Sequence, residues 1–357
     1  MKILLISPKE DKPTGGISIW TNAYLEAIEA KEIGDVTVVN TAAVGERAVN
    51  GSAKRNILDE FKRTRRILRD LKQALRKETF DVAHINTSCG TFGVIRDFLI
   101  AKRIKKKAPS TRIVVHYHCD IPYQVGNKLS KHYLRKLSAL ADARLVLCEN
   151  SRKYLKEQFS LESEKVPNFI DENSILEGEK TIRETVERIF FVGRVSSAKG
   201  AAEIYELARR FPAISFRLAG AVSEEVAQWE LPQNLSLLGP LSHDNVLREM
   251  DEADLFLFPS HSEGFSVALM EAMARGLPAI ATDVGANADM LNLTGSHIVS
   301  VGDVVAMSNA LEHLKNAQVR AQISLASVKK VKENYVAEVV MENLKRYYAS
   351  RDTIASP

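Results

Sequence analysis

The chain has 357 residues, of which 45% are hydrophobic and 26% charged, with a net charge of +4. This composition is typical of a folded protein of about two domains and excludes a disordered chain. No apolar stretch approaches the roughly 20 residues of a membrane-spanning helix, and the apolar N-terminal run is too short for a signal peptide. We therefore expect a cytoplasmic protein.

The charge is divided unevenly along the chain. Residues 1–165 contain 31 Lys and Arg against 19 Asp and Glu, whereas the remainder contains 18 against 26. This asymmetry predicts an anionic partner for the first half, such as a membrane surface, a phosphorylated lipid or nucleic acid. Few aromatic residues lie among the basic runs, which disfavours single-stranded nucleic acid. The basic runs are residues 54–72, 102–107 and 128–136.

Short apolar segments alternate with helical patterns through the first half. Their continuous apolarity predicts parallel strands that are covered on both faces. Helical patterns of ten or more residues, such as residues 57–76, lie between them. The predicted strands are residues 2–7, 36–40, 82–86, 112–118 and 144–148.

Two features of the first half follow predicted strands. Residues 13–16, Pro-Thr-Gly-Gly, precede a helix that we expect to begin near Ser18. They lack the G-x-G-x-x-G spacing of a dinucleotide site and are compatible with a simple turn. His116 and His118 end a strand on the same face, where they would serve either packing or ligand binding. No third ligand with suitable spacing accompanies them, so we expect no metal site.

The second half repeats the alternation of strands and helices. Its boundary with the first half is predicted at residues 166–168, Val-Pro-Asn, before a polar stretch. A last helical pattern, residues 333–351, is long enough to return to the first domain. The predicted strands are residues 189–192, 215–219, 235–238, 255–259 and 279–282.

This pattern predicts an α/β protein with two doubly wound, Rossmann-like domains that face each other across a cleft. The predicted domains are residues 1–165, joined by a C-terminal helix of residues 334–357, and residues 166–333. The three cysteines have no C-x-x-C spacing, so they are predicted to be small buried side chains in a reducing compartment.

A first candidate site lies after the strand at residues 189–192. Gly193 and Arg194 follow this strand directly, and Lys199 and Gly200 open the next helix. A guanidinium fork and a lysine near a helix N-terminus favour binding of a diphosphate. The alternative is a pair of surface cations beside a turn.

A second candidate site contains two glutamates eight residues apart. Glu263 lies on a loop, whereas Glu271 lies on a helix predicted from near Ser266 to Ala274. Gly264 permits a close backbone approach, and the helix N-terminus would leave amides unpaired for an anion. Those amides belong to Phe265, Ser266 and Val267. No two aspartates stand two residues apart, so an Asp-x-Asp metal motif is missing, and we expect neither metal nor cofactor.

The two sites together resemble the retaining glycosyltransferases of family 4, also called glycosyl transferases group 1, which have the GT-B fold. The matching patterns are G-R-x4-K-G at residues 193–200 and E-G-F-x5-E-A-x3-G-x-P at residues 263–278. Residues 166–168 also resemble the family's entry into its second domain. The resemblance covers residues 165–290 well and the first half in outline.

The resemblance implies a role for each matching residue. Arg194 and Lys199 would hold the diphosphate of a nucleotide sugar, Glu263 would contact the donor sugar, and Glu271 the ribose. His118 would hydrogen-bond the sugar or help to position the acceptor. The implied catalytic residues are His118, Glu263, Arg194 and Lys199. The implied donor-binding residues are Gly15, Gly16, Gly193, Arg194, Lys199, Leu241, Glu263, Gly264, Phe265, Ser266, Val267 and Glu271.

We therefore expect a metal-independent, retaining hexosyltransferase. It would move a sugar from a nucleotide diphosphate, with a UDP-sugar as the expected donor, to a glycan or lipid-linked glycan in cell-surface polysaccharide synthesis. The basic first half would contact an anionic membrane at the inner face of the cell. The alternatives are a sugar-nucleotide epimerase of the same fold and a non-catalytic protein that binds anionic membrane or RNA.

Overall fold

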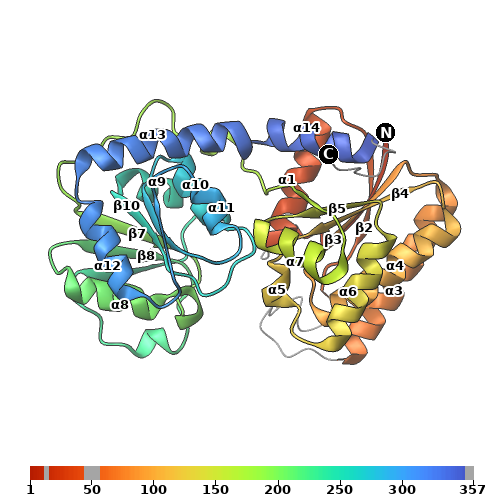
Figure 1. Cartoon of the computed structure of the whole chain (residues 1–357), viewed down its shortest axis with the longest axis horizontal. Coiled ribbons are helices and arrows are strands. Elements are labelled where there is room, and N and C mark those ends of the chain that lie inside the picture. Colours follow the sequence, from red (N-terminus) through yellow and green to blue (C-terminus); the bar gives the residue numbers. More distant parts are fainter. Residues whose placement is uncertain (12–15, 44–56, 350–357) are drawn as a thin grey trace. The chain divides into compact units, whose positions relative to one another are not determined.

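The computed structural model describes residues 1–11, 16–43 and 57–349, and the chain divides into two units (Figure 1). Unit 1 comprises Met1–Asn168 and the chain from Val340 onward, and unit 2 comprises Phe169–Val339. The sequence places the boundary between residues 165 and 166, and the division falls between residues 168 and 169.

Unit 1 contains, among its described residues, a parallel sheet with the order β2-β1-β3-β4-β5-β6. The order of sequential strands reverses between β1 and β3, as in doubly wound folds. The strands are β1 (Lys2–Ser7), β2 (Asp35–Asn40), β3 (Val82–Thr87), β4 (Arg112–Tyr117), β5 (Ala143–Val146) and β6 (Glu164–Lys165). The helices are α1 (Gly16–Ala30), α3 (Ile57–Lys77), α4 (Thr91–Lys107), α5 (Ile121–Gln124), α6 (Lys128–Leu140) and α7 (Glu149–Phe159).

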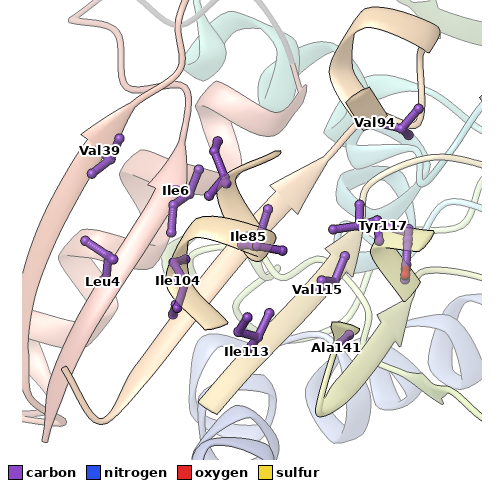
Figure 2. Close-up of a cluster of buried hydrophobic side chains, with 14 of the residues drawn as sticks. Leu4, Ile6, Val39, Ile85, Val94, Ile104, Ile113, Val115, Tyr117 and Ala141 are labelled. Atoms are coloured by element: carbon purple, nitrogen blue, oxygen red, sulfur yellow. The ribbon is translucent and has the colours of Figure 1, made fainter. Parts of the chain in front are cut away.

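The two faces of this sheet differ in chemistry because successive side chains of a strand point to opposite sides. One face is apolar: Leu4, Ile6 and Ile85 pack with Ile104 of α4 and are fully buried (Figure 2). Removal of this apolar surface from water stabilises the unit, at about 25 cal/mol per Å². The opposite face carries buried polar side chains, which are Ser7, His84, Asn86 and His116.

The predicted C-terminal helical pattern, residues 333–351, corresponds to helix α14, which begins four residues later than the pattern, at Ala337. Helix α13 (Ala317–Asn334) belongs to unit 2, and α14 (Ala337–Ala349) reaches unit 1. Tyr335 and Val336 interrupt the pattern because the Ile170 amide donates to the Tyr335 carbonyl oxygen at 3.0 Å and Val336 forms a bridge with Ile170. The predicted residues 350–357 lie outside the described residues.

Helix α14 is anchored on the polar face of the unit 1 sheet. The Tyr348 hydroxyl lies 2.8 Å from the Tyr24 hydroxyl of α1 and 2.5 Å from His84 Nδ1 of β3. Arg112 Nε donates to the Tyr347 carbonyl oxygen at 2.8 Å. Helix α14 therefore packs on unit 1, the unit that also contains the N-terminal strand β1.

Unit 2 contains, within the described residues, a second parallel sheet with the order β12-β11-β10-β7-β8-β9. The strands are β7 (Arg188–Val192), β8 (Ser215–Ala219), β9 (Leu235–Gly239), β10 (Leu255–Phe258), β11 (Ala279–Thr282) and β12 (His297–Val299). The α-helices besides α13 are α8 (Ala201–Arg210), α9 (His243–Glu252), α10 (Val267–Ala274), α11 (Asn287–Leu291) and α12 (Val304–His313). The predicted doubly wound α/β organisation is confirmed in each unit.

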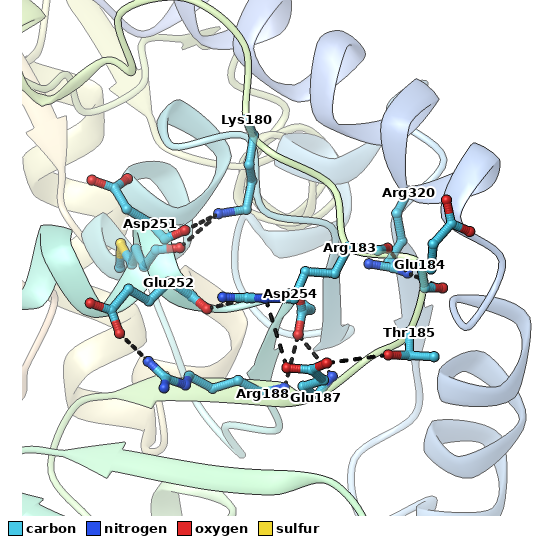
Figure 3. A network of polar contacts seen from close by, with 11 residues as sticks. Lys180, Arg183, Glu184, Thr185, Glu187, Arg188, Asp251, Glu252, Asp254 and Arg320 are labelled. Carbon is cyan, nitrogen blue, oxygen red and sulfur yellow. Dashed lines mark hydrogen bonds and ion pairs between the residues drawn. The ribbon is translucent and has the colours of Figure 1, made fainter.

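The amino ends of β7 and β10 are tied together by a polar network (Figure 3). Asp254, which directly precedes β10, accepts from the amides of Glu187 and Arg188 at 2.8 and 2.9 Å. It also accepts from Arg183 Nη1 at 2.9 Å. These donors compensate the cost of burying the Asp254 carboxylate, whose residue is 3% exposed. The network therefore holds together the amino ends of these strands, at the end of the sheet opposite to the loops that follow β7 and β10.

Two expectations from composition can be compared with this structure. Cys89, Cys119 and Cys148 are free and buried, which confirms their prediction as small buried side chains. In the part of the chain that the structure describes, no helix combines the length and apolarity needed to cross a membrane.

Candidate functional site

The loops after β7 and β10 lie where the strand order of unit 2 reverses. The two strands are neighbours in the sheet, whereas β8 and β9 lie on the far side of β7. Open parallel sheets bind ligands outside the carboxyl ends of their strands at such a point. The loop of residues 193–200 and the loop that begins the second motif, at residue 263, both occupy this edge. The fold therefore brings the two sequence motifs together.

Two glycines let the loops after β7 and β11 approach the loop after β10 closely. Gly200 has φ 83° and precedes α8, and an added Cβ there would lie 2.3 Å from the Pro259 carbonyl oxygen. Gly285, with φ 56°, follows β11, and an added Cβ would lie 2.5 Å from the Gly264 carbonyl oxygen. The Ala286 amide donates to that same oxygen at 3.0 Å. Side chains at either glycine would push the loops apart, so the site depends on both.

Lys199 and Glu263 form an ion pair at this edge. Lys199 Nζ lies 2.5 Å from Glu263 Oε1 and donates to the Ser262 carbonyl oxygen at 3.3 Å. The two side chains are 31% and 13% exposed, so the pair is partly shielded from water. The sequence predicts both residues in the site but not their pairing. A bound diphosphate would compete with Glu263 for the ammonium group.

Further donors in the site have no partner within the described part of the chain. Arg194, which follows Gly193 at the end of β7, is exposed and makes neither an ion pair nor a side-chain hydrogen bond there. Ser266 caps α10 through its Oγ, which accepts from the Leu269 amide at 3.1 Å. The remaining amides at this helix start, those of Phe265, Ser266 and Val267, make no hydrogen bond within the described residues. Together, Arg194 and these amides can donate hydrogen bonds to a phosphate group and neutralise its charge.

Glu271 has a partner that sequence reasoning missed. His243 Nε2, on α9, lies 2.9 Å from Glu271 Oε1, and Glu271 is 13% exposed. The hydrogen bond to Glu271 raises the pKa of His243, and nearby Asp244 and Asp171 act in the same direction. Leu241 lies two residues before His243 and is half-buried. His243 is 28 residues from Glu271, so no local sequence pattern could have paired them.

The predicted residues of unit 1 follow β1 and β4. His118 directly follows β4, and its ring lies 4.1 Å from that of the buried His116. Burial lowers the pKa of His116 to about 4. Gly16 begins α1, two residues before the predicted helix start, and Gly15 lies outside the described residues. Among the described residues, no three His, Cys, Asp or Glu side chains group in a way that could hold a metal ion.

Two family models match the chain and together cover most of it. The model described as "Glycosyltransferase Family 4" matches residues 14–174, and the model described as "Glycosyl transferases group 1" matches residues 173–330. Each model corresponds to most of one unit. The chain belongs to the family 4, group 1 glycosyltransferases.

Curated relatives of this glycosyltransferase carry transferase names. It is 26% identical to a 2-deoxystreptamine N-acetyl-D-glucosaminyltransferase of Niallia circulans over 78% of each chain. It is 24% identical to a phosphatidyl-myo-inositol mannosyltransferase of Mycobacterium leprae over 68% of each chain. It is 28% identical to a capsular polysaccharide biosynthesis glycosyltransferase of Staphylococcus aureus over 45% of each chain. These relatives support a transferase over the epimerase and the non-catalytic binding protein.

Solved structures similar to this glycosyltransferase share its fold. A sucrose-phosphate synthase of Thermosynechococcus elongatus matches with a TM-score of 0.75 at 17% identity, covering 97% of this chain and 98% of that one. A lipopolysaccharide outer core galactosyltransferase matches with a TM-score of 0.74 at 16% identity, covering 97% and 99%. The Anabaena protein HepE in complex with UDP-glucose matches with a TM-score of 0.71 at 16% identity, covering 96% and 98%. The predicted GT-B fold is confirmed.

The site of this glycosyltransferase contains a further pair that the sequence did not reveal. His261 Nε2 lies 2.6 Å from Glu203 Oε1 on α8, while the buried Glu203 Oε2 has no partner within the described residues. His261 stands two residues before Glu263 in the loop after β10. A histidine beside a serine in a loop does not indicate any particular partner, so the contact with Glu203 is revealed only by the fold.

Proposed function

We propose that this glycosyltransferase moves a hexosyl group from a nucleotide diphosphate sugar, a UDP-sugar in particular, to a glycan acceptor. The observation that carries the proposal is the set of cations and free amides at the carboxyl edge of the unit 2 sheet. Lys199, Arg194 and the first amides of α10 all come from loops at the reversal of strand order. A diphosphate would find there the charge complement that it needs.

The remaining predicted residues would bind the rest of the donor. Glu271 would exchange His243 for the ribose hydroxyls, and Glu263 would exchange Lys199 for hydroxyls of the sugar. Leu241 would lie against the nucleobase, and Gly264 would let the sugar approach the backbone. Carboxylates are strong acceptors for hydroxyl groups, which supports the exchange in both cases.

The chemistry would depend on stabilising the departing diphosphate. Negative charge develops on the diphosphate as the bond to the sugar breaks, and fixed donors stabilise such charge without reorganisation. Lys199, Arg194 and the α10 amides would supply these donors without a metal ion. The acceptor hydroxyl would attack from the face that the diphosphate leaves and give its proton to a departing phosphate oxygen, which retains the configuration of the sugar. His118 would contact the sugar during this step.

The acceptor class is proposed from the names of the relatives. They include a phosphatidyl-myo-inositol mannosyltransferase and a capsular polysaccharide glycosyltransferase. We therefore assign this enzyme to the assembly of a glycolipid or a cell-surface polysaccharide, with a lipid-linked glycan as acceptor.

An anionic membrane surface at the inner face of the cell is the further partner in this proposal. Helices α3 and α4 of unit 1 border a groove of about 970 Å³. Its lining includes Ile57, Phe61 and Leu99, which are 71, 67 and 37% exposed. The exposed basic side chains on the same groove are Lys62, Arg65, Arg69, Lys72 and Arg103. Exposed apolar side chains among basic ones suit the boundary between lipid headgroups and acyl chains.

Thermal unfolding with a panel of nucleotide diphosphates and their sugars tests the donor site. A ligand at 100 times its Kd adds about 2.7 kcal/mol, which should raise the Tm of the wild type by roughly 5 °C. The double variant Arg194→Ala/Lys199→Ala should lose this shift for every ligand. Its basal Tm should fall because Glu263 loses its counter-charge, so the ligand-induced shift is the quantity to compare.

The matched control is Arg209→Ala/Lys329→Ala, which removes two exposed cations of unit 2 outside both motifs. It should keep the full shift. An unchanged ligand-induced shift in the Arg194→Ala/Lys199→Ala variant would refute the phosphate site, and with it the proposed donor.

A further inference from the structure

A hydrogen-bonded chain crosses the polar face of the unit 1 sheet and ends at His118. Thr21 Oγ1 donates to the Ile17 carbonyl oxygen at 2.7 Å and lies 2.6 Å from Ser7 Oγ. Asn86 Nδ2 lies 2.9 Å from Ser7 Oγ, and Asn86 Oδ1 lies 3.0 Å from His118 Nε2. Ser7 and Thr21 are 0% exposed and Asn86 is 2% exposed. Because these side chains are buried, water does not compete with their partners, and the partners determine where each hydrogen lies.

The Ile17 carbonyl fixes the direction of every hydrogen bond in this chain, because a carbonyl oxygen only accepts. Thr21 has one hydroxyl hydrogen, which it directs at Ile17, so it must accept from Ser7. Ser7 has then used its own hydrogen, so it must accept from Asn86. The NH2 group of Asn86 therefore faces Ser7, and its carbonyl oxygen faces the histidine.

His118 is consequently held in a single neutral tautomer. An amide oxygen accepts only, so His118 Nε2 must carry the hydrogen and Nδ1 must carry the lone pair. Burial, followed by the neighbouring His116 and His84, lowers the pKa of His118 well below its usual range, so the ring is neutral at neutral pH. Nδ1 makes no hydrogen bond within the described residues, and the His118 residue is half-buried.

We infer that Asn86 is a positioning residue that presents the Nδ1 lone pair of His118 to a hydroxyl group of the donor sugar. A nitrogen with a lone pair accepts a hydrogen bond from a hydroxyl but has no hydrogen to donate to a phosphate oxygen. The arrangement therefore selects a sugar hydroxyl over the diphosphate as the ligand of His118. The choice of ligand rests on the proposed function, whereas the tautomer depends on unit 1 alone.

Nitrogen-15 NMR of the full chain with labelled histidines tests the tautomer, with His118→Gln used to assign the signals. We expect a hydrogen on Nε2 of His118 in the wild type. Thr21→Val keeps the side-chain shape but frees the Ser7 hydrogen, so the Asn86 amide can turn and both tautomers should appear. Asn86→Leu removes the acceptor and should also abolish the preference.

The matched control is Ser138→Ala, which breaks a buried hydrogen bond of 2.7 Å to Tyr117 on the opposite face of the same sheet. It should lower the stability of unit 1 but leave the His118 tautomer unchanged. A wild-type ring with its hydrogen on Nδ1 would overturn the inference. A tautomer that stays the same in both Thr21→Val and Asn86→Leu would also overturn it.

UDP-glucose, which is bound in the Anabaena neighbour, serves as the probe for the ligand. Saturation should shift the His118 Nδ1 signal, and Asn86→Leu should bind UDP-glucose about tenfold more weakly than Ser138→Ala. If UDP-glucose binds without moving the Nδ1 signal, the sugar is not the ligand of His118. That result leaves the phosphate site standing, because the thermal-shift comparison of the Arg194 and Lys199 variants tests it separately.

Discussion

Each glutamate of the candidate site is paired with a basic side chain within unit 2. Glu263 lies against Lys199 and Glu271 against His243, and both carboxylates are 13% exposed. An unpaired carboxylate at this depth would cost about 1–3 kcal/mol or more. A partly exposed ion pair contributes at most about 1 kcal/mol, so a ligand can exchange it easily. The pairs thus keep the site stable and yet open to substitution by sugar hydroxyls.

The His243–Glu271 pair predicts that donor binding depends on pH. The pKa of His243 is raised above its ordinary value of 6.5, so the pair is fully charged below that value and is lost as pH rises through the raised pKa. Release of Glu271 should then favour the ribose. We expect UDP to bind more tightly at pH 8 than at pH 6, by no more than about fivefold for an exposed pair. Calorimetric titration across this range measures the change.

His243→Ala should remove this pH dependence, since Glu271 then has no competing partner on α9. His132→Ala, which removes an exposed histidine on α6 of unit 1, should leave the dependence as in the wild type. A wild-type affinity that falls as pH rises would contradict the proposed exchange at Glu271.

The sequence predicted Arg194 and Lys199 from their places after a strand and before a helix, and Glu263 and Glu271 from the pattern that resembles the family. It could not predict their partners. The Lys199–Glu263 contact joins residues 64 apart, and whether the two meet depends on how closely the loops after β7 and β10 pack. The tautomer of His118 was equally inaccessible, since it follows from four residues on three different elements.

At the scale of elements, continuous apolar runs identified ten strands, whose ends shift by up to two residues in the structure. The two short strands that were missed, β6 and β12, lie at sheet edges and have only two and three residues. Edge strands need less apolar sequence, because fewer neighbours cover them. The last helical pattern was predicted to start at residue 333, whereas α14 starts at Ala337. Tyr335 and Val336 fit a helical pattern but are held outside it by their contacts with Ile170.

Gly285 shows how one element positions another. Gly285→Ala would place a Cβ against the carbonyl oxygens of Gly264 and Glu263, at 2.5 and 2.6 Å, and displace the loop that carries Glu263. We expect a loss of stability above the 1–2 kcal/mol or so that a positive φ costs, together with a loss of the UDP-induced thermal shift. Thermal unfolding with and without UDP measures both effects.

Gly178→Ala is the matched control for this substitution. Gly178 has φ 82°, but an added Cβ there would meet nothing within 4 Å. It should lower Tm through backbone strain and keep the full UDP-induced shift. Equal ligand shifts in Gly285→Ala and Gly178→Ala would show that contact with Gly264 does not shape the donor site.

For the whole molecule, the sequence revealed the charge asymmetry but not how the basic residues are used. Arg63 and Arg66 of α3 turn inward, where Arg63 Nε donates to the Thr41 carbonyl oxygen at 2.9 Å and Arg66 Nη2 to the Ala42 carbonyl oxygen at 3.1 Å. Lys54 and Arg55 lie outside the described residues. The exposed apolar side chains of the α3–α4 groove were not predicted, because their positions fit the helical pattern of α3 and α4 equally well as core. Together they turn a basic surface into an amphipathic one.

We predict that the protein binds anionic membranes through the α3–α4 groove. Each basic residue near an anionic membrane contributes about 1 kcal/mol, so the variant with Lys62, Arg65, Arg69 and Lys72 changed to Glu should lose affinity roughly a thousandfold or more. Sedimentation with vesicles of phosphatidylglycerol and phosphatidylcholine measures it, and vesicles of phosphatidylcholine alone should bind weakly. The matched control reverses Lys128, Lys131, Arg135 and Lys136 on α6, which carry the same charge on another helix. Equal losses in the two variants would mean that net charge, rather than the α3–α4 groove, attracts the membrane.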